Sequence, residues 1–112
     1  MPLSVEPIGD VTVVAVNVDQ LDASNSEDFR REVAPVLADA RKVVLDLERV
    51  QFVDSRGCGA ILSCLKQLAA NGGDLKLCGV RKAVRTVFEL IRLHRITGIY
   101  DTREAAVEAF AK

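Results

Sequence analysis

Residues 43–65 read VVLDLERVQFVDSRGCGAILSCL, and this stretch decides the fold. Its first part, Val43–Leu47, is a nearly continuous apolar run of the kind found in strands that are covered on both faces of a parallel sheet. Its last part places apolar residues at helical spacing after Gly57, which predicts a helix over residues 57–71. A buried strand that leads into a helix is typical of an α/β fold, and we expect this strand to be the central one.

The segment before the central strand predicts another helix. Apolar residues recur there at helical intervals, which indicates a helix over residues 25–39. Ser24 and Glu27 have the spacing of a capping box at its start. Pro35 lies inside this helix and removes one backbone donor, so we expect a kink or an early stop there.

The remainder of the chain continues the alternation of strands and helices. Residues 74–78 alternate like a strand with one polar face, and helical spacing returns over residues 84–91. Ile99-Tyr100 predicts a short edge strand, and Thr102 is placed to cap a last helix over residues 104–110.

A hairpin precedes all of these elements. β-branched residues alternate on both sides of Gly9-Asp10, which predicts strands near 3–8 and 11–17 joined by a two-residue turn. The expected order is therefore ββαβαβαβα, an α/β fold with a mixed sheet, an N-terminal hairpin followed by parallel crossovers, and about four helices. The length of 112 residues fits a single domain, residues 1–112.

Composition excludes several classes of function. Fifteen basic and 16 acidic residues give a net charge of −1, which supplies no field for nucleic acid or an anionic membrane. Aromatic residues make up 4% of the chain, too few for a base-stacking platform. No apolar run is long enough to span a bilayer, and residues 1–10 lack the features of a secretory signal. We therefore expect a cytoplasmic protein that neither binds nucleic acid nor inserts directly into membrane.

No catalytic, metal or cofactor site can be identified from the sequence. The three cysteines Cys58, Cys64 and Cys78 form no CxxC pair, and His94 is the single histidine, so zinc ligation and nucleophilic catalysis are not indicated. We interpret Cys58 as a small buried apolar residue and expect all three thiols to be reduced. A dinucleotide fingerprint is absent because Leu62 stands where its third glycine would be.

Two loops remain as the place where a ligand or partner would bind. Sites in α/β sheets lie beyond the carboxyl ends of strands, where loops lead into helices, and residues 20–25 and 52–59 are such loops. Ser55 lies at or beside a helix N-cap, where backbone N–H groups favour an anion such as phosphate. From spacing alone, the commoner role of such a serine is a capping hydroxyl. Gly57 and Gly59 keep the approach open.

The central stretch, with Val43–Leu47, Asp54-Ser55, Gly57 and Gly59, resembles the signature of the STAS domain, named for sulphate transporters and anti-sigma factor antagonists. The resemblance extends over nearly the whole chain, and as a free-standing domain it looks like a bacterial anti-sigma factor antagonist. Such a protein is not an enzyme. In that family a GHKL-type anti-sigma kinase phosphorylates the serine that follows the aspartate. Only the unphosphorylated form binds the kinase and frees a sigma factor, and a PP2C-type phosphatase resets the switch.

The resemblance implies roles for particular residues here. Ser55 would be the phosphoacceptor, flanked by the acidic pair Asp22 and Asp54. The partner-binding surface would consist of Asp22, Asn25, Asp54, Ser55, Arg56, Gly57 and Gly59. A phosphate beside two carboxylates would disrupt a fitted interface by repulsion, whereas the helix N-terminus would tolerate it, so we expect binding to stop without refolding.

One position departs from the family pattern and leaves alternatives open. Phosphorylated members commonly have Ser or Thr after the phosphoacceptor, and this chain has Arg56. Arginine either clamps the phosphate or obstructs the kinase. One alternative function is a STAS accessory subunit that binds the ATPase of an ABC-type lipid transporter without phosphorylation. Another is an enzyme with Cys58 or Ser55 as nucleophile, although the sequence shows no base for either.

Overall fold

The computed structural model describes residues 1–111; Lys112, the last residue of the expected domain, lies outside them. The strands are β1 (Leu3–Ile8), β2 (Val11–Val16), β3 (Gln20–Leu21), β4 (Lys42–Asp46), β5 (Phe52–Val53), β6 (Asp74–Cys78) and β7 (Gly98–Tyr100). The helices are α1 (Ser26–Ala38), α2 (Ser55–Ala70), α3 (Lys82–Leu90), the 3-10 helix η1 (Leu93–Arg95) and α4 (Arg103–Ala109). The longer elements confirm the expected ββαβαβαβα order, to which the short β3, β5 and η1 are additions.

The main sheet has the strand order β1-β2-β4-β6-β7. β1 pairs with β2 in antiparallel fashion around Gly9, whose φ of 62° suits the tight turn. All other pairs are parallel, with Leu45 of β4 opposite Val14 on one side and Leu77 on the other. The predictions that β4 is central and that β7 lies at the edge are therefore confirmed. β4 is apolar because both of its faces are covered.

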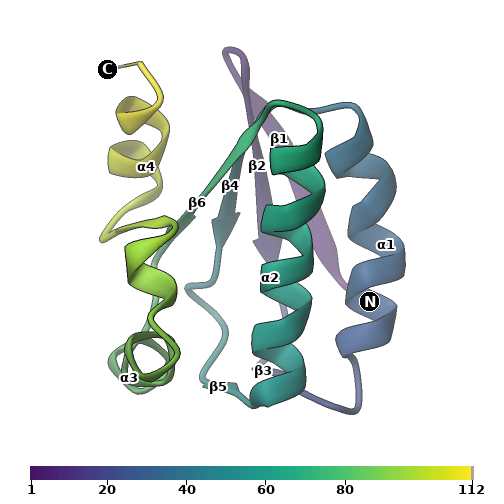
Figure 1. Ribbon diagram of the computed structural model, residues 1–112, viewed down its shortest axis with the longest axis vertical. Coiled ribbons are helices and arrows are strands. Elements are labelled where there is room, and N and C mark those ends of the chain that lie inside the picture. The colour runs from purple at the N-terminus through teal and green to yellow at the C-terminus, as the bar shows by residue number, and fades with distance from the viewer. Residues whose placement is uncertain (112) are drawn as a thin grey trace.

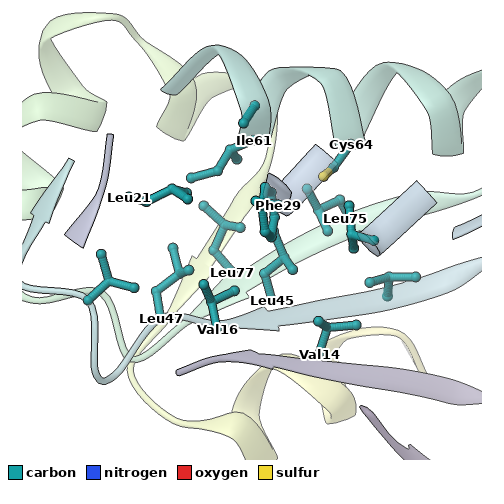
Figure 2. Packing of buried hydrophobic residues seen from close by; sticks show 14 of the residues in the cluster. Val14, Val16, Leu21, Phe29, Leu45, Leu47, Ile61, Cys64, Leu75 and Leu77 are labelled. Atoms are coloured by element: carbon teal, nitrogen blue, oxygen red, sulfur yellow. The ribbon is translucent and has the colours of Figure 1, made fainter. Parts of the chain in front are cut away.

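Helices cover the two faces of this sheet unequally. Figure 1 shows α1 and α2 side by side, with α4 on the other side of the sheet. The larger core lies under α1 and α2, where Phe29, Ile61 and Cys64 meet Leu45 and Leu77 from the strands (Figure 2). The smaller core lies between the opposite face and α4. Because side chains alternate along a strand, each buried strand supplies both cores.

The start and middle of α1 correct two predictions. The capping box is wrong: Asn25 is the N-cap residue, and the Ser24 hydroxyl donates to Asp22 Oδ1 (2.5 Å) instead of capping the helix. The early stop at Pro35 is also wrong, because α1 continues through Pro35 to Ala38. Leu37, beyond the proline, is fully buried, so its packing offsets the lost backbone hydrogen bond.

The last helix is fixed at its first turn. Thr102 is the N-cap residue, as predicted, and its hydroxyl accepts a hydrogen bond from the Ala105 N–H (3.0 Å). Arg103 Nη2 lies 2.8 Å from Asp46 Oδ2 at the end of β4, and Arg103 Nη1 lies 2.6 Å from Glu6 Oε1 on β1. These ion pairs hold α4 against the face of the sheet that α1 and α2 leave uncovered.

The cysteines behave as small apolar residues. Cys58, Cys64 and Cys78 are buried and free. Burial raises the pKa of the Cys58 thiol, and it raises the pKa values of Cys64 and Cys78 to about 12. The structural interpretation of Cys58 agrees with this burial. Among residues 1–111, no helix has the length and hydropathy to cross a bilayer.

Candidate functional site

The two loops that the sequence singled out lie next to each other. β3 and β5 form a separate two-stranded parallel sheet, with Leu21 opposite Val53. Each short strand leads into a helix, so residues 20–25 at the start of α1 and residues 52–59, which include the first turn of α2, lie next to each other at one end of the molecule (Figure 1). The surface formed by these two loops is called the loop site below.

Asp54 joins the two halves of the loop site. Its Oδ1 accepts the Gly57 N–H (2.8 Å), which makes Asp54 the N-cap residue of α2, and its Oδ2 accepts the Ala23 N–H from the other loop (3.0 Å). The hydrogen bond from Gly57 is the main reason that the pKa of Asp54 is lowered. Because Asp54 supplies the cap, Ser55 is the first helical residue and is exposed. The capping-hydroxyl interpretation of Ser55 is therefore wrong.

The other loop is held by its own side chains. Asp22 Oδ1 accepts the Ser24 N–H (2.9 Å), and Asn25 Oδ1 accepts the Asp22 N–H (3.0 Å). Asn25 Nδ2 donates to the Gln20 carbonyl (2.8 Å), so this side chain ties the loop to β3. The structure thus brings together the loop that carries Asp22 and the loop that carries Asp54, and Ser55 follows Asp54 directly.

Gly57 and Gly59 have different neighbours. A Cβ on Gly57 would lie 2.1 Å from the Leu21 carbonyl oxygen, so the start of α2 packs directly on the backbone of β3. A Cβ on Gly59 would lie 3.3 Å from Nη2 of Arg30 on α1. Gly57 is therefore required by packing, whereas Gly59 leaves space for a guanidinium. Arg56 is exposed beside Ser55, and its positive charge and backbone N–H also help to lower the pKa of Asp54.

An exposed aromatic residue at the loop site was missed by the sequence analysis. The Phe52 side chain on β5 is 56% exposed, whereas Val53 beside it is 3% exposed. The alternation of a strand explains the difference, because one side chain faces the core and the next faces solvent. β5 has only two residues, so no periodic pattern revealed it. Phe52 gives the loop site an apolar contact two residues before Asp54.

The charge on Asp54 should stabilise the fold in a pH-dependent way. The folded pKa lies below the ordinary value of 3.8, so the contribution is fully present above pH 3.8 and is lost as the pH falls through the lower folded pKa. Asp54→Asn keeps a good N-cap residue but has no charge to titrate. Urea unfolding should show wild type more stable than this variant at pH 6, by a margin that shrinks at pH 3. An equal margin at both pH values would contradict this role.

The fold and the loop site together define the class of protein. A hairpin leads into a mixed sheet, and an exposed serine lies at the start of the helix that follows the central strand. The chain belongs to the STAS domain family, whose model matches residues 3–106.

Relatives within this family place the chain more closely. BtrV of Bordetella bronchiseptica is named as a proposed anti-sigma factor antagonist. It is 35% identical to this chain, and the match covers 98% of this chain and 95% of BtrV. A crystal structure of a proposed anti-sigma factor antagonist from Thermotoga maritima superposes with a TM-score of 0.91 at 28% identity, covering 98% of this chain and 95% of that one. The anti-sigma factor antagonist SpoIIAA of Bacillus shares the fold.

The SpoIIAA comparison includes two chemical states of that protein. The unphosphorylated form covers 98% of both chains, the phosphorylated form covers 97% of this chain and 99% of that one, and each gives a TM-score of 0.74 at 22% identity. Anti-sigma factor antagonists are regulatory binding proteins and not enzymes, so the family relationship sets aside the enzyme alternative built on Cys58 or Ser55. The raised pKa of the buried Cys58 thiol also argues against a nucleophile there.

Proposed function

We propose that this chain is a cytoplasmic anti-sigma factor antagonist. In its unphosphorylated form, the loop site binds a GHKL-type anti-sigma serine kinase, and the kinase then releases its sigma factor. The kinase transfers the γ-phosphoryl group of ATP to the Ser55 oxygen, ADP leaves, and the hydroxyl proton passes to the kinase. A PP2C-type phosphatase removes the phosphate by hydrolysis. The observation that carries the proposal is the exposed Ser55 within a braced loop site.

Accessibility and shape support binding at this place. Ser55 and Arg56 are exposed at the first turn of α2, and Phe52, three residues before Ser55, exposes an apolar side chain on β5. Interfaces commonly combine an apolar or aromatic anchor with a polar rim. We assign the partner-binding role to the residues that the loop site brings together, which are Asp22, Asn25, Asp54, Ser55 and Arg56, with Gly57 and Gly59 shaping the surface beneath them.

The negative charge of a phosphate supports the proposal that phosphorylation of Ser55 switches binding off. A phosphate on Ser55 would add a charge of about −1.5 to −2 next to the carboxylates of Asp22 and Asp54. A partner surface fitted to the neutral serine would then face a strongly negative patch, and like-charge contacts across an interface cost several kcal/mol. The backbone would have little reason to move, because Asp54 and Asn25 already satisfy the neighbouring N–H groups. We therefore propose that phosphorylation abolishes binding without refolding.

Intact-mass measurement tests whether Ser55 is the phosphoacceptor. The protein is incubated with ATP and each GHKL-type kinase of its source organism, and we expect a gain of one phosphate, about 80 Da. Ser55→Ala should abolish the gain, while Ser24→Ala, a matched change in the facing loop, should retain it. If no kinase adds phosphate although one of them forms a complex, Arg56 marks a binding module that is not phosphorylated. A gain that survives in Ser55→Ala would place the phosphate elsewhere.

A further inference from the structure

Arg30 of α1 packs over Gly59 of α2, on the face of α2 that also carries Ser55. Residues four apart on a helix are neighbours, with Cβ atoms about 5–6 Å apart, so Gly59 lies one turn below Ser55. The Arg30 guanidinium occupies the space over Gly59, with Nη2 3.3 Å from where a Cβ would be. Because Cβ atoms tilt toward the N-terminus of a helix, a Cβ on Gly59 would point toward the turn that begins at Ser55, and the Arg30 guanidinium lies against that Cβ position.

The packing of two helices produces this arrangement. α1 and α2 lie side by side and begin at the same end of the molecule (Figure 1). Arg30 lies in the second turn of α1, and Gly59 lies in the second turn of α2. A side chain on residue 59 would occupy the space that the guanidinium fills.

Arg30 is only loosely committed to another partner. Its Nε lies 3.9 Å from Glu27 Oε1, beyond hydrogen-bond distance, and its side chain is 42% exposed. Arg31, the next residue, forms a close ion pair with Asp28 and is 72% exposed. A phosphate carries more charge than a carboxylate and accepts paired N–H groups from arginine, so it would compete well for Arg30.

Arg56 is less well placed than Arg30 to bind a phosphate on Ser55. It follows Ser55 directly in α2, and adjacent residues on a helix do not face each other. The sequence left Arg56 open as either a phosphate clamp or an obstacle to the kinase, and nothing in the sequence shows that Arg30, 25 residues before Ser55, packs over Gly59 in the next turn of α2.

We propose that phosphate on Ser55 is bound by Arg30 across the α1–α2 packing, over Gly59. This inference rests on the proposed function in that it assumes Ser55 to be the phosphorylated residue. The clamp turns the phosphate toward the protein's own surface, stabilises the phosphorylated form and leaves the backbone in place. The capture draws Arg30 away from Glu27 and adds a cross-link between α1 and α2.

The test uses protein with phosphoserine installed at position 55 during translation, so no kinase is needed. A ³¹P NMR titration gives the second pKa of the phosphate, ordinarily about 6. A guanidinium that binds the phosphate favours the dianion, so Arg30→Gln should raise this pKa by about 0.5 unit or more relative to the parent. Arg31→Gln, a matched change on the same helix, should leave it unchanged. Arg30→Lys, which keeps the charge, should retain most of the lowering.

Equal pKa values in the parent and Arg30→Gln proteins would overturn the clamp. An equal rise in Arg30→Gln and Arg31→Gln would also overturn it, because the effect would then be general charge and not contact. Arg30 is a surface residue, and the circular dichroism spectrum of each variant confirms that it is folded. Failure of this test leaves the switch at Ser55 standing, whereas failure of the kinase experiment removes the switch without changing the NMR result.

Discussion

Ser55→Glu should weaken binding to the GHKL-type kinase by roughly 100-fold, which corresponds to about 2.7 kcal/mol. The new carboxylate would stand at the first turn of α2, beside the Asp54 cap and near Asp22 in the facing loop. A partner surface shaped for an uncharged serine would have to desolvate this charge next to two others. Glutamate carries less charge than phosphate, so the phosphorylated protein should bind more weakly still.

Ser55→Gln is the matched control for size. Glutamine has the shape of glutamate without its charge, so binding of this variant should stay within a few-fold of the wild-type affinity. Isothermal titration calorimetry with the proposed GHKL-type kinase partner provides the dissociation constants. If Gln and Glu weaken binding equally, bulk and not charge blocks the partner, and the electrostatic account of the switch is wrong.

Gly57→Ala should destabilise the protein by about 2 kcal/mol or more. The added methyl group would lie 2.1 Å from the Leu21 carbonyl oxygen and 2.9 Å from Val53 Cγ1, so either β3 or the start of α2 must shift. Overpacking of this kind typically costs about 1–3 kcal/mol, and the contact here is with backbone. The cost of this overpacking exceeds the gain in helix propensity, which is about 1 kcal/mol for alanine over glycine.

Gly59→Ala is the control for helix propensity. It lies two residues along the same helix, and its added methyl group would meet only the flexible end of Arg30 at 3.3 Å. This variant should be as stable as wild type or slightly more stable. Urea denaturation at neutral pH compares the two variants, and equal stability of both would show that the close approach of α2 to β3 is not what requires Gly57.

The main sheet and its helices could be predicted because their sequence patterns are long. The apolar run at 43–47 identifies β4, the helical spacing after Gly57 identifies α2, and the Thr102 cap marks α4. The register of β3 against β5 could not be predicted, because each strand has two residues and their pairing joins segments about 30 residues apart. Short-range patterns carry no information on such a pairing.

The sequence predicted which residues make up the candidate site, but not the hydrogen bonds and packing contacts between them. The motif identified Asp54, Ser55 and Gly57, whereas the bond from Ala23 to Asp54 and the packing of Arg30 over Gly59 depend on tertiary structure. The capping box at Ser24 failed for a related reason. Loop side chains hydrogen-bond among themselves there, and this competition is not visible in a four-residue spacing.

Release of the sigma factor is the measurement that tests the central claim most directly. A complex of the kinase with its sigma factor is titrated with the unphosphorylated protein and, separately, with protein that carries phosphoserine at position 55. The account predicts that the unphosphorylated protein displaces the sigma factor and that the phosphorylated protein displaces none at the same concentrations. Equal displacement by both forms, or displacement by neither, would contradict it.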